Sequence, residues 1–331
     1  MEQMTKTSMY LIPDLHNPES TKPSRDGFGK AIVELGEKDE NVWALTADVS
    51  ESTRTHWFSD KFSKRFIQVG VAEQNLAGVA AGIASCGKKV FVSAYGVFSP
   101  GRNWDQLRVS ICYNDVPVFF HGSHTGVTVG PDGASHQALE DIAITRVIPN
   151  LTVIAPADLE EAKKATIAVY DNGHPAYIRT CREKLPVFTT EKTPFEIGKA
   201  NVYREGKDAA IFACGPLVYQ SLLAAEKLEK EGISCAVIDC HTIKPIDKDA
   251  IIEWAKKTGL IISAEEHQID GGLGSAIAEV LSENACPGVL IRHGVHNRFC
   301  ESGTAKELLK KYKFDADGIA DVVRNSMKVK K

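Results

Sequence analysis

The chain alternates apolar, β-branched runs with helical stretches that are rich in small residues. In the first half the runs are NVWALTA, RFIQVG, KKVFVSA, VPVFFHG, LTVIAPA and AYIRT. Each run has the length of a buried strand and is followed by a segment with the composition of a helix or loop. Strands that are apolar on both faces are typical of parallel sheets with helices on either side. The alternation therefore predicts an α/β fold built on a mostly parallel sheet.

A second series of the same kind begins near residue 195. Its runs are AAIFACG, SCAVIDC, LIISAEE and GVLIRHG, separated by helical stretches such as DKDAIIEWAKKTG. The length of 331 residues suits two domains, each with its own core. The segment LPVFTTEKTPFEIG between the two series is rich in proline and threonine, which is typical of a linker. We expect an arm over residues 1–20 and domains over 21–190 and 191–331, with the boundary near Glu191.

Composition excludes several classes of protein. The 39 Lys and Arg residues against 43 Asp and Glu give a net charge of -4, so there is no basic excess for binding nucleic acid. The N-terminus MEQMTKTSMYLIPD has neither the apolar stretch of a signal peptide nor that of a membrane helix, and we expect a cytoplasmic protein with no membrane partner. The 8 cysteines form no CxxC pair, which predicts reduced core thiols and no metal site.

Chemistry is expected in the loops that follow the apolar runs, because open α/β sheets bind ligands at the carboxyl ends of their strands. No GxxxxGK[ST], GxGxxG or GxSxG motif occurs, so the usual support for a nucleotide kinase, a dinucleotide enzyme or a serine hydrolase is missing. In RFIQVGVAEQNLAGVAAG, Glu73 stands where a strand gives way to a helix of small residues. It either complements the helix dipole, worth about 0.3 to 1 kcal/mol, or has a functional role.

The loop HGSHTGVTVGPDGASHQALED is the second candidate region. It concentrates His124, Asp132 and His136 among glycines, whose ordering is entropically costly, and imidazoles titrate near neutral pH. This combination indicates a site that admits a substrate and moves protons. His121 ends an apolar strand, and we interpret it as a core residue. A helix that begins with Ser135 as its N-cap is compatible with the same stretch.

Further candidates follow other apolar runs. Tyr95 and Phe98 lie three residues apart after KKVFVSA, where they either fill the core or form a stacking wall for a flat heterocycle. Arginines suit phosphate because the guanidinium donates two parallel hydrogen bonds. The remaining polar candidates are Arg25, Asp48, Ser52 and Arg182. Two arginines with a serine suggest a phosphorylated substrate.

Taken together, TADVSES, RFIQVGVAEQN, SAYGVF, HTGVTVGPDGASHQ, ALEDIAITRVIPNLTVIAPAD and TCREKLP resemble, in order, the pyrimidine-binding domain of transketolase. SAEEHQIDGGLGSAIAE resembles the C-terminal domain of the same thiamine diphosphate-dependent family, so the resemblance runs from about Arg25 to the end. The GDG motif that holds diphosphate and metal in the family does not occur. The resemblance therefore implies the C-terminal subunit of a split transketolase. A separate N-terminal subunit would supply the Mg²⁺ and diphosphate site, in an α2β2 assembly.

The resemblance also implies residue roles around the cofactor. Glu73 matches the glutamate that contacts the aminopyrimidine ring. Tyr95, where phenylalanine is commoner, and Phe98 match aromatic residues of the pyrimidine pocket, and Asp48 matches a carboxylate near the cofactor. A third aromatic residue of the family is replaced around Gly101, with one extra residue before Arg108. The role of the neighbouring Arg102 stays open.

On the substrate side, His124 and His136 match histidines that contact the donor sugar and transfer protons, and Asp132 matches a carboxylate that binds a hydroxyl. The residues that match the phosphate clamp are Arg25, Ser52 and Arg182. The implied activity is transfer of a two-carbon ketol unit from a ketose phosphate to an aldose phosphate. The alternatives are a 2-oxoacid dehydrogenase β-subunit, an enzyme like deoxyxylulose phosphate synthase, and a catalytically silent scaffold subunit.

Overall fold

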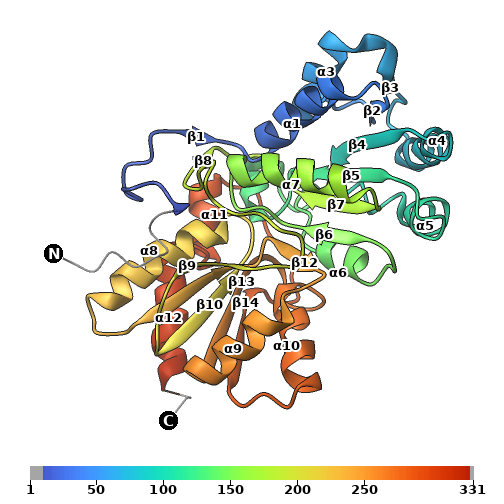
Figure 1. The fold of residues 1–331 in the computed structure, drawn as a ribbon. Coiled ribbons are helices and arrows are strands. Elements are labelled where there is room, and N and C mark those ends of the chain that lie inside the picture. Colours follow the sequence, from blue (N-terminus) through green and yellow to red (C-terminus); the bar gives the residue numbers. More distant parts are fainter. Residues whose placement is uncertain (1–9, 329–331) are drawn as a thin grey trace.

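The first α/β unit is built on a seven-stranded sheet. The computed structural model describes residues 10–328 (Figure 1). The strand order is β12-β6-β7-β5-β4-β2-β3, and all neighbours are parallel except β12, which runs antiparallel to β6. The strands are β2 (Val42–Thr46), β3 (Phe66–Gln68), β4 (Lys89–Tyr95), β5 (Val118–Ser123), β6 (Thr152–Ile154), β7 (Ala176–Arg179) and β12 (Thr242–Lys244). The mostly parallel sheet predicted from the apolar runs is confirmed.

The second unit has a five-stranded sheet of the same kind. Its order is β14-β13-β10-β11-β9, with the edge strand β9 antiparallel to β11. The strands are β9 (Asn201–Arg204), β10 (Ala209–Ala213), β11 (Cys235–Asp239), β13 (Leu260–Gln268) and β14 (Val289–Val295). Strand β12 comes from this half of the sequence but completes the first sheet, so the two units share a strand as well as a surface.

Helices cover both faces of the first sheet, as the apolar runs require. Phe91 of β4 packs into a core with Phe28 of α1, and the alternate residue Val92 packs into a different core with Leu76 of α4. This is the period-two alternation of a strand that is buried on both faces. The helices are α1 (Arg25–Lys38), α2 (Ser50–Thr53), α3 (His56–Lys61), α4 (Glu73–Ser85), α5 (Trp104–Gln106), α6 (Asp141–Arg146) and α7 (Leu159–Asn172).

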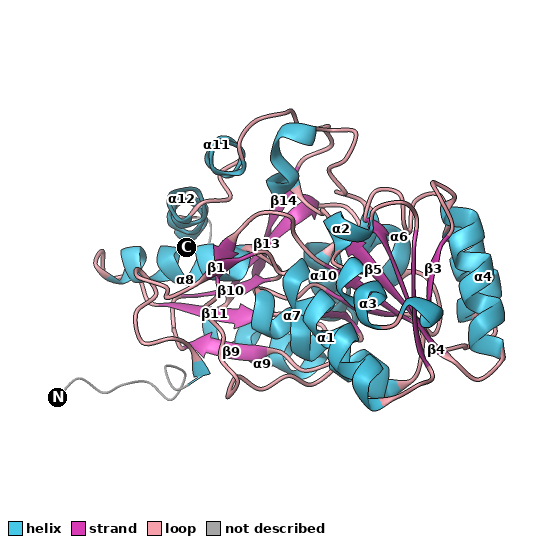
Figure 2. Cartoon of the chain, turned by 90° about the horizontal axis from the view of Figure 1, so that it is seen from above, coloured by secondary structure: helices cyan, strands magenta, loops and turns pink. Residues whose placement is uncertain are grey.

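The second sheet is covered in the same way. Its helices are α8 (Leu217–Glu229), α9 (Lys248–Thr258), α10 (Leu273–Glu283), α11 (Ala305–Lys311) and α12 (Ala316–Met327). Side-chain caps set the starts of α9 and α12, since Asp247 accepts from the N–H of Ala250 and Asp315 from that of Gly318. Seen from above, α8, α11 and α12 lie at one end of the molecule and α4 at the other (Figure 2).

The segment between the two units is ordered and partly buried. Phe188 is fully buried, and its N–H and that of Thr189 both donate to the carboxylate of Asp158. Strand β8 (Leu185–Pro186) pairs antiparallel with β1 (Thr21–Lys22), and Leu11 of the arm bridges to Thr189. The expected linker thus lies beside the expected arm, of which residues 1–9 are outside the described part. The domain boundary near Glu191 stays a prediction.

Two predictions about local structure were wrong. Ser135 does not cap a helix, because its hydroxyl contacts His136 and the next helix, α6, begins at Asp141. The intervening backbone is used in a bridge between Thr125 and Ala138. The cysteines are all free, but Cys86 is exposed. No helix among residues 10–328 is long and apolar enough to cross a membrane.

Candidate active site

The predicted site residues gather at the carboxyl ends of neighbouring parallel strands. Tyr95 ends β4, and His124 directly follows β5, whose last residue, Ser123, is paired with Tyr95. Arg182 follows the next strand, β7, and Arg25 begins α1. Because parallel strands end at the same edge of the sheet, residues far apart in the sequence come together here.

His124 lies among the residues predicted to bind substrate. It is 2% exposed and has a left-handed backbone with φ of 58°. Arg25 Nη1 lies 3.0 Å from its Nε2, and the Ser123 hydroxyl lies 2.8 Å from its Nδ1. Burial first, and then the charges of Arg25 and Arg182, lower the pKa of His124 to about 2. The imidazole is therefore neutral, and since an arginine only donates, Nε2 is the acceptor and Nδ1 carries the proton.

The same imidazole stacks on the aromatic wall. The rings of His124 and Tyr95 are 4.0 Å apart at 26°, and Phe98 lies 6.2 Å from Tyr95 at 24°. His136 meets the edges of both rings, at 5.3 Å from Phe98 and 6.0 Å from Tyr95. The structure thus brings both predicted catalytic histidines to the two predicted aromatic residues.

The predicted phosphate residues lie around His124. Arg25 Nη1 donates to the backbone carbonyl of Ser52 at 2.8 Å, and Arg25 Nε is buried without a hydrogen-bond partner within residues 10–328. Arg182 Nη1 donates to Val129 O at 3.0 Å and to Asp132 Oδ1 at 3.3 Å. The second arginine is thereby held by the glycine-rich loop. Two cations and a neutral imidazole line this part of the edge.

Glu73 is the first residue of α4, and its side chain is buried. It is 4% exposed, and Arg102 Nη1 lies 3.1 Å from each of its carboxylate oxygens. The guanidinium of Arg102 also lies 4.1 Å from the centroid of the Phe98 ring. The carboxylate therefore stands beside the aromatic wall, and a stacking surface and a buried acid occur together. The sequence did not predict the contact to Arg102, because it depends on the irregular backbone at Gly101.

Comparison with known families agrees with this arrangement. The family model of the transketolase pyrimidine binding domain matches residues 21–187, and that of the transketolase C-terminal domain matches residues 198–319. The chain belongs to the transketolase family. The matched ranges correspond to the two α/β units of the structure.

Several transketolase relatives have the length of this chain. It is 42% identical over 309 residues to a putative transketolase C-terminal section of Methanocaldococcus jannaschii, covering 93% of this chain and 97% of that protein. It is 39% identical to the 6-deoxy-6-sulfo-D-fructose transketolase subunit SqwH of a Clostridium species, covering 89% and 91%. A solved split gene transketolase, described as an inactive beta4 tetramer, has a TM-score of 0.84 at 39% identity and 93% and 99% coverage.

Longer relatives match only in part. The chain is 36% identical to the 1-deoxy-D-xylulose-5-phosphate synthase of Caldanaerobacter subterraneus, and the match covers 90% of this chain but 48% of that protein. The chain therefore corresponds to about half of a fused enzyme, as the resemblance implied. It is a transketolase-type split subunit.

Asp48 is the one predicted residue that stands apart from this cluster. It is exposed, has φ of 61°, and its N–H donates to Gln68 Oε1 at 2.6 Å. Among residues 10–328, its carboxylate has no hydrogen bond or ion pair with any of the other predicted site residues. The structure gives it a conformation at the end of β2 that aspartate tolerates in a turn. Its role near a cofactor stays a prediction.

The loop that carries Asp132 and His136 rests on the second unit. Gly126 has φ of 76°, and a Cβ there would lie 2.4 Å from Glu266 Oε2. Thr128 Oγ1 donates to the same oxygen at 2.9 Å. Only a glycine permits this approach, so the loop is positioned by β13 of the other unit.

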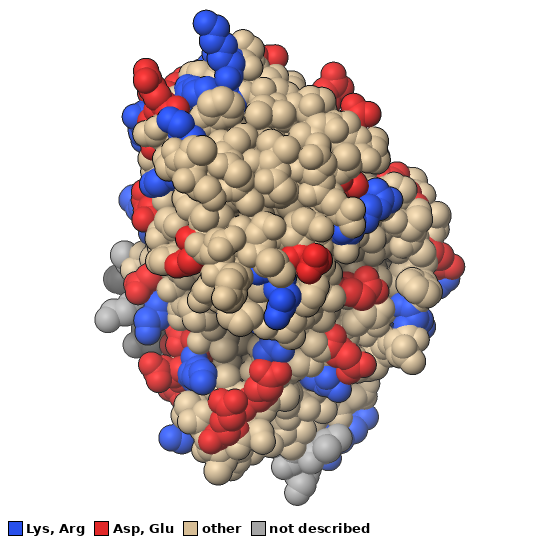
Figure 3. Space-filling view, turned by 90° about the vertical axis from the view of Figure 1, so that its right-hand side faces the viewer, with Lys and Arg blue, Asp and Glu red and all other residues tan. Residues whose placement is uncertain are grey.

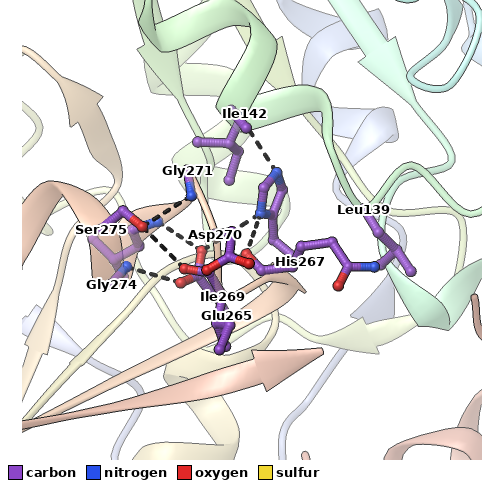
Figure 4. A network of polar contacts seen from close by, with 12 residues as sticks. Leu139, Ile142, Glu265, His267, Ile269, Asp270, Gly271, Gly274 and Ser275 are labelled. Atoms are coloured by element: carbon purple, nitrogen blue, oxygen red, sulfur yellow. Dashed lines mark hydrogen bonds and ion pairs between the residues drawn. The ribbon is translucent and has the colours of Figure 1, made fainter. Parts of the chain in front are cut away.

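A buried polar network joins the two units behind the site. Arg179 Nε donates to Asp141 Oδ2 at 2.8 Å and Arg179 Nη2 to Glu266 O at 2.6 Å. Glu265 accepts from the N–H groups of Leu273 and Gly274 at the start of α10 (Figure 4). Burial raises the pKa of Glu265 and that of Glu266 to about 7. These groups are enclosed. Arg179 and Glu266 link the loop to the second unit, and Glu265 holds the start of α10.

His121 belongs to the interior, as expected from its strand position. It is 1% exposed, stacks on Phe28 at 3.7 Å, and contacts the hydroxyls of Ser93 at 2.6 Å and Thr180 at 2.7 Å. Burial lowers its pKa to about 3. Its two ring nitrogens are both satisfied, so it supports the end of β5 and offers nothing to a ligand. Within residues 10–328 no group of three or more His, Cys, Asp or Glu side chains is arranged to hold a metal ion.

Proposed function

We propose that the chain is the C-terminal subunit of a two-subunit transketolase. It would transfer a two-carbon ketol unit from a ketose phosphate to an aldose phosphate, with thiamine diphosphate and Mg²⁺. The observation that carries the proposal is the grouping of a buried Glu73, the aromatic pair Tyr95 and Phe98, and the Arg25–His124 contact on one sheet edge.

The donor set of this edge suits a flat, basic heterocycle. A buried carboxyl next to ring faces binds an amidine-like nitrogen edge by hydrogen bonds and the ring by stacking. Glu73 would hold the aminopyrimidine nitrogen, and Phe98 with Tyr95 would line the ring. Thiamine diphosphate, when bound, supplies the nucleophile and the electron sink for cleaving a carbon–carbon bond. The chain's own part is to position groups and to hold protons at defined atoms.

Arg25 and Arg182 are proposed to bind the phosphate of the sugar. Arg25 contacts His124 directly, and Arg182 contacts Val129 and Asp132 in the loop that follows His124. The buried Nε of Arg25 has no partner among residues 10–328 and is free to donate to a ligand. A phosphate between them would gain charge-assisted hydrogen bonds, and the Ser52 hydroxyl would donate a further one. The Asp132 carboxylate, which only accepts, would bind a sugar hydroxyl.

His124 and His136 are proposed to bind sugar oxygens and to move protons. Because the imidazole of His124 is neutral, Nε2 can accept a hydrogen bond while Nδ1 donates one. The Ser123 hydroxyl at Nδ1 orients the ring. A sugar hydroxyl that takes the place of Arg25 on Nε2 would find an acceptor there. His136, whose ring meets those of Tyr95 and Phe98 edge to face, would bind a second oxygen.

A partner is required because no GDG motif occurs in this chain. We infer that an N-terminal transketolase subunit holds the diphosphate and Mg²⁺ and docks next to Glu73, giving an α2β2 assembly. The surface on this side of the molecule has a broad area without charged residues (Figure 3). The exposed residues of α4 are Gln74, Asn75, Gly78, Gly82 and Ser85. An uncharged face of small side chains allows close backbone packing against a partner.

The sugar is not defined by these residues. Relatives are named for 6-deoxy-6-sulfo-D-fructose and apulose-4-phosphate, so donors with an anionic group at the far end form the class to test. Synthesis of deoxyxylulose phosphate is the second candidate, because fused synthases are 36% identical or more. A 2-oxoacid dehydrogenase subunit and a silent scaffold are the remaining alternatives.

The deciding experiment is reconstitution. The chain, a candidate N-terminal subunit and the mixture are each supplied with thiamine diphosphate and Mg²⁺, and assayed with xylulose and ribose phosphates. We expect turnover only in the mixture. Turnover with pyruvate and an aldehyde phosphate, or with pyruvate and an electron acceptor, would favour the other enzymes, and no turnover with any donor would favour the scaffold.

A further inference from the structure

The side chain of Arg102 contacts Glu73 and Phe98, the two residues that are proposed to bind the aminopyrimidine ring of the cofactor. Its Nη1 is 3.1 Å from Oε1 and from Oε2 of Glu73, and its guanidinium lies 4.1 Å from the centroid of the Phe98 ring. One flat cation therefore engages the carboxylate with its edge and the aromatic ring nearby. An aminopyrimidine has the same two features, a nitrogen edge and a flat face.

The local backbone sets this position. The N–H of Arg102 donates to Phe98 O at 2.8 Å, so Arg102 lies one turn above the ring. A Cβ on the preceding Gly101 would lie 2.2 Å from Val97 O, so this tight turn requires a residue without a side chain. The helix that follows is widened: the N–H of Tyr113 donates to the carbonyl of Arg108, five residues back. Such widened turns are frequent at functional sites.

The pair is asymmetric in its exposure. The side chain of Glu73 is 4% exposed and that of Arg102 is 51% exposed, so the arginine lies on the solvent side of the acid. Among residues 10–328, Arg102 is the only residue that forms an ion pair with Glu73. A buried carboxylate without a partner is costly, and the arginine compensates for this burial. A half-exposed side chain can leave without disturbing the core.

We propose that Arg102 is a gating residue that competes with the thiamine ring for Glu73. In the isolated subunit its guanidinium takes the place of the aminopyrimidine on Glu73 and Phe98. When the cofactor binds, the arginine turns outward and the heterocycle becomes the partner of the buried acid. The inference rests on the proposed function, since it takes thiamine diphosphate as the competing ligand.

The test is the affinity of the assembled complex for thiamine diphosphate, measured by isothermal titration calorimetry with Mg²⁺ present. Arg102→Met keeps the length of the side chain and removes the charge. We expect the dissociation constant to fall about three- to tenfold, the range in which an ion pair of this exposure competes. Arg108→Met is the matched control, because Arg108 is exposed on the same segment and forms no ion pair within residues 10–328, and it should bind as the wild type does.

A second variant separates this inference from the proposed function. Glu73→Gln should weaken binding, and in that background Arg102→Met should no longer tighten it, because the arginine has no carboxylate to hold. Urea unfolding of each isolated chain verifies that it is folded. If Glu73→Gln weakens binding but Arg102→Met leaves it unchanged or weaker, the gate is contradicted while the proposed function stands. If Glu73→Gln binds normally, the proposed role of Glu73 fails, and the gate with it.

Discussion

The two sheets of this protein are both mostly parallel and covered by helices, but the polar side chains at the ends of their strands differ in their exposure to solvent. In the first sheet, Arg25, Arg182 and His136 are partly open to solvent, and the buried Glu73 is paired with Arg102, whose side chain is 51% exposed. In the second sheet the polar residues at the end of β13 are enclosed. Glu265 and Glu266 are 0% and 1% exposed and are held by backbone N–H groups and a hydroxyl.

This difference shows that a shifted pKa does not by itself locate a site. Burial raises the pKa of both Glu265 and Glu266 to about 7 and lowers that of His267 to about 4. Yet Glu266 and His267 contact the first unit, and Glu265 contacts the start of α10. Desolvation shifts a titration wherever a polar group is enclosed. At the first sheet, function is indicated by the grouping of Arg25, the imidazole of His124 and the ring of Tyr95 at one edge.

The largest effect is expected where the two units meet. Arg179→Met removes a buried cation from Asp141 and from the carbonyls of Ala138 and Glu266. Because this leaves a buried carboxylate without its charge partner, we expect a loss of about 3 to 5 kcal/mol in the free energy of unfolding, measured with urea. Lys248→Met, which breaks an exposed pair with Glu283, should cost less than about 1 kcal/mol. Equal stability of the two variants would remove the structural role of the network.

The next effect is a pH dependence of stability at Glu266. Its folded pKa of about 7 lies above the ordinary value of 4.5, so the folded state binds more protons between these values and loses stability as the pH rises through them. Glu266→Gln does not titrate. The unfolding free energy of this variant minus that of the wild type should therefore increase from about pH 4.5 to 7, by on the order of 3 kcal/mol, and then stay level.

Glu279→Gln serves as the control for that series. The pKa of Glu279 is lowered by its hydrogen bond to Arg146, so its contribution is present above pH 4.5 and is lost as the pH falls. Removal of Glu279 should therefore give a pH dependence of the opposite sign. If the difference in unfolding free energy between Glu266→Gln and the wild type does not change with pH, the carboxyl of Glu266 is as well solvated as one on the surface.

On the open side, Arg25→Met should affect the substrate and leave the fold intact. Losing a charge-assisted donor to phosphate should raise KM for the donor sugar about 10- to 100-fold in the assembled complex. Lys22→Met, in the exposed strand β1, should leave KM unchanged. If Arg25→Met lowers the free energy of unfolding and leaves KM unchanged, Arg25 is a structural residue like those of the second sheet.

The smallest effect is expected at the aromatic wall. Tyr95→Leu removes the ring that stacks on His124 at 4.0 Å, and we expect kcat/KM to fall about two- to tenfold, the worth of one aromatic contact. Tyr95→Phe retains the ring and should stay within about twofold of the wild type. If both variants lose activity equally, the hydroxyl matters and the stacking interpretation is wrong.

Much of the site followed from the sequence, for a physical reason. Parallel strands end at one edge, so the chemistry was expected in the loops that follow the apolar runs, and Tyr95 and His124 meet there. Contacts that depend on the path of irregular backbone were not predictable in this way. Arg102 reaches Glu73 because of a tight turn at Gly101. Helix α6 begins at Asp141 and is not capped by Ser135, because the backbone before it forms a bridge with Thr125.

Strand β12 illustrates the same limit. Thr242–Lys244 lies within the second series of runs, but it pairs with β6 of the first sheet. A short strand carries no periodicity long enough to reveal which sheet it joins, since this depends on how the two units pack. The sequence pattern therefore predicted the number and kind of sheets better than their edges.

The central claim is that Glu73 acts on the cofactor while the carboxylates of the second sheet only hold the fold. The most direct test compares Glu73→Gln with Glu265→Gln in the assembled complex, measuring kcat at saturating thiamine diphosphate together with the unfolding free energy of each chain. We predict that Glu73→Gln lowers kcat by about 100-fold or more and stays folded, whereas Glu265→Gln changes stability and keeps kcat within a few-fold. Full turnover of Glu73→Gln at saturating cofactor would contradict the account.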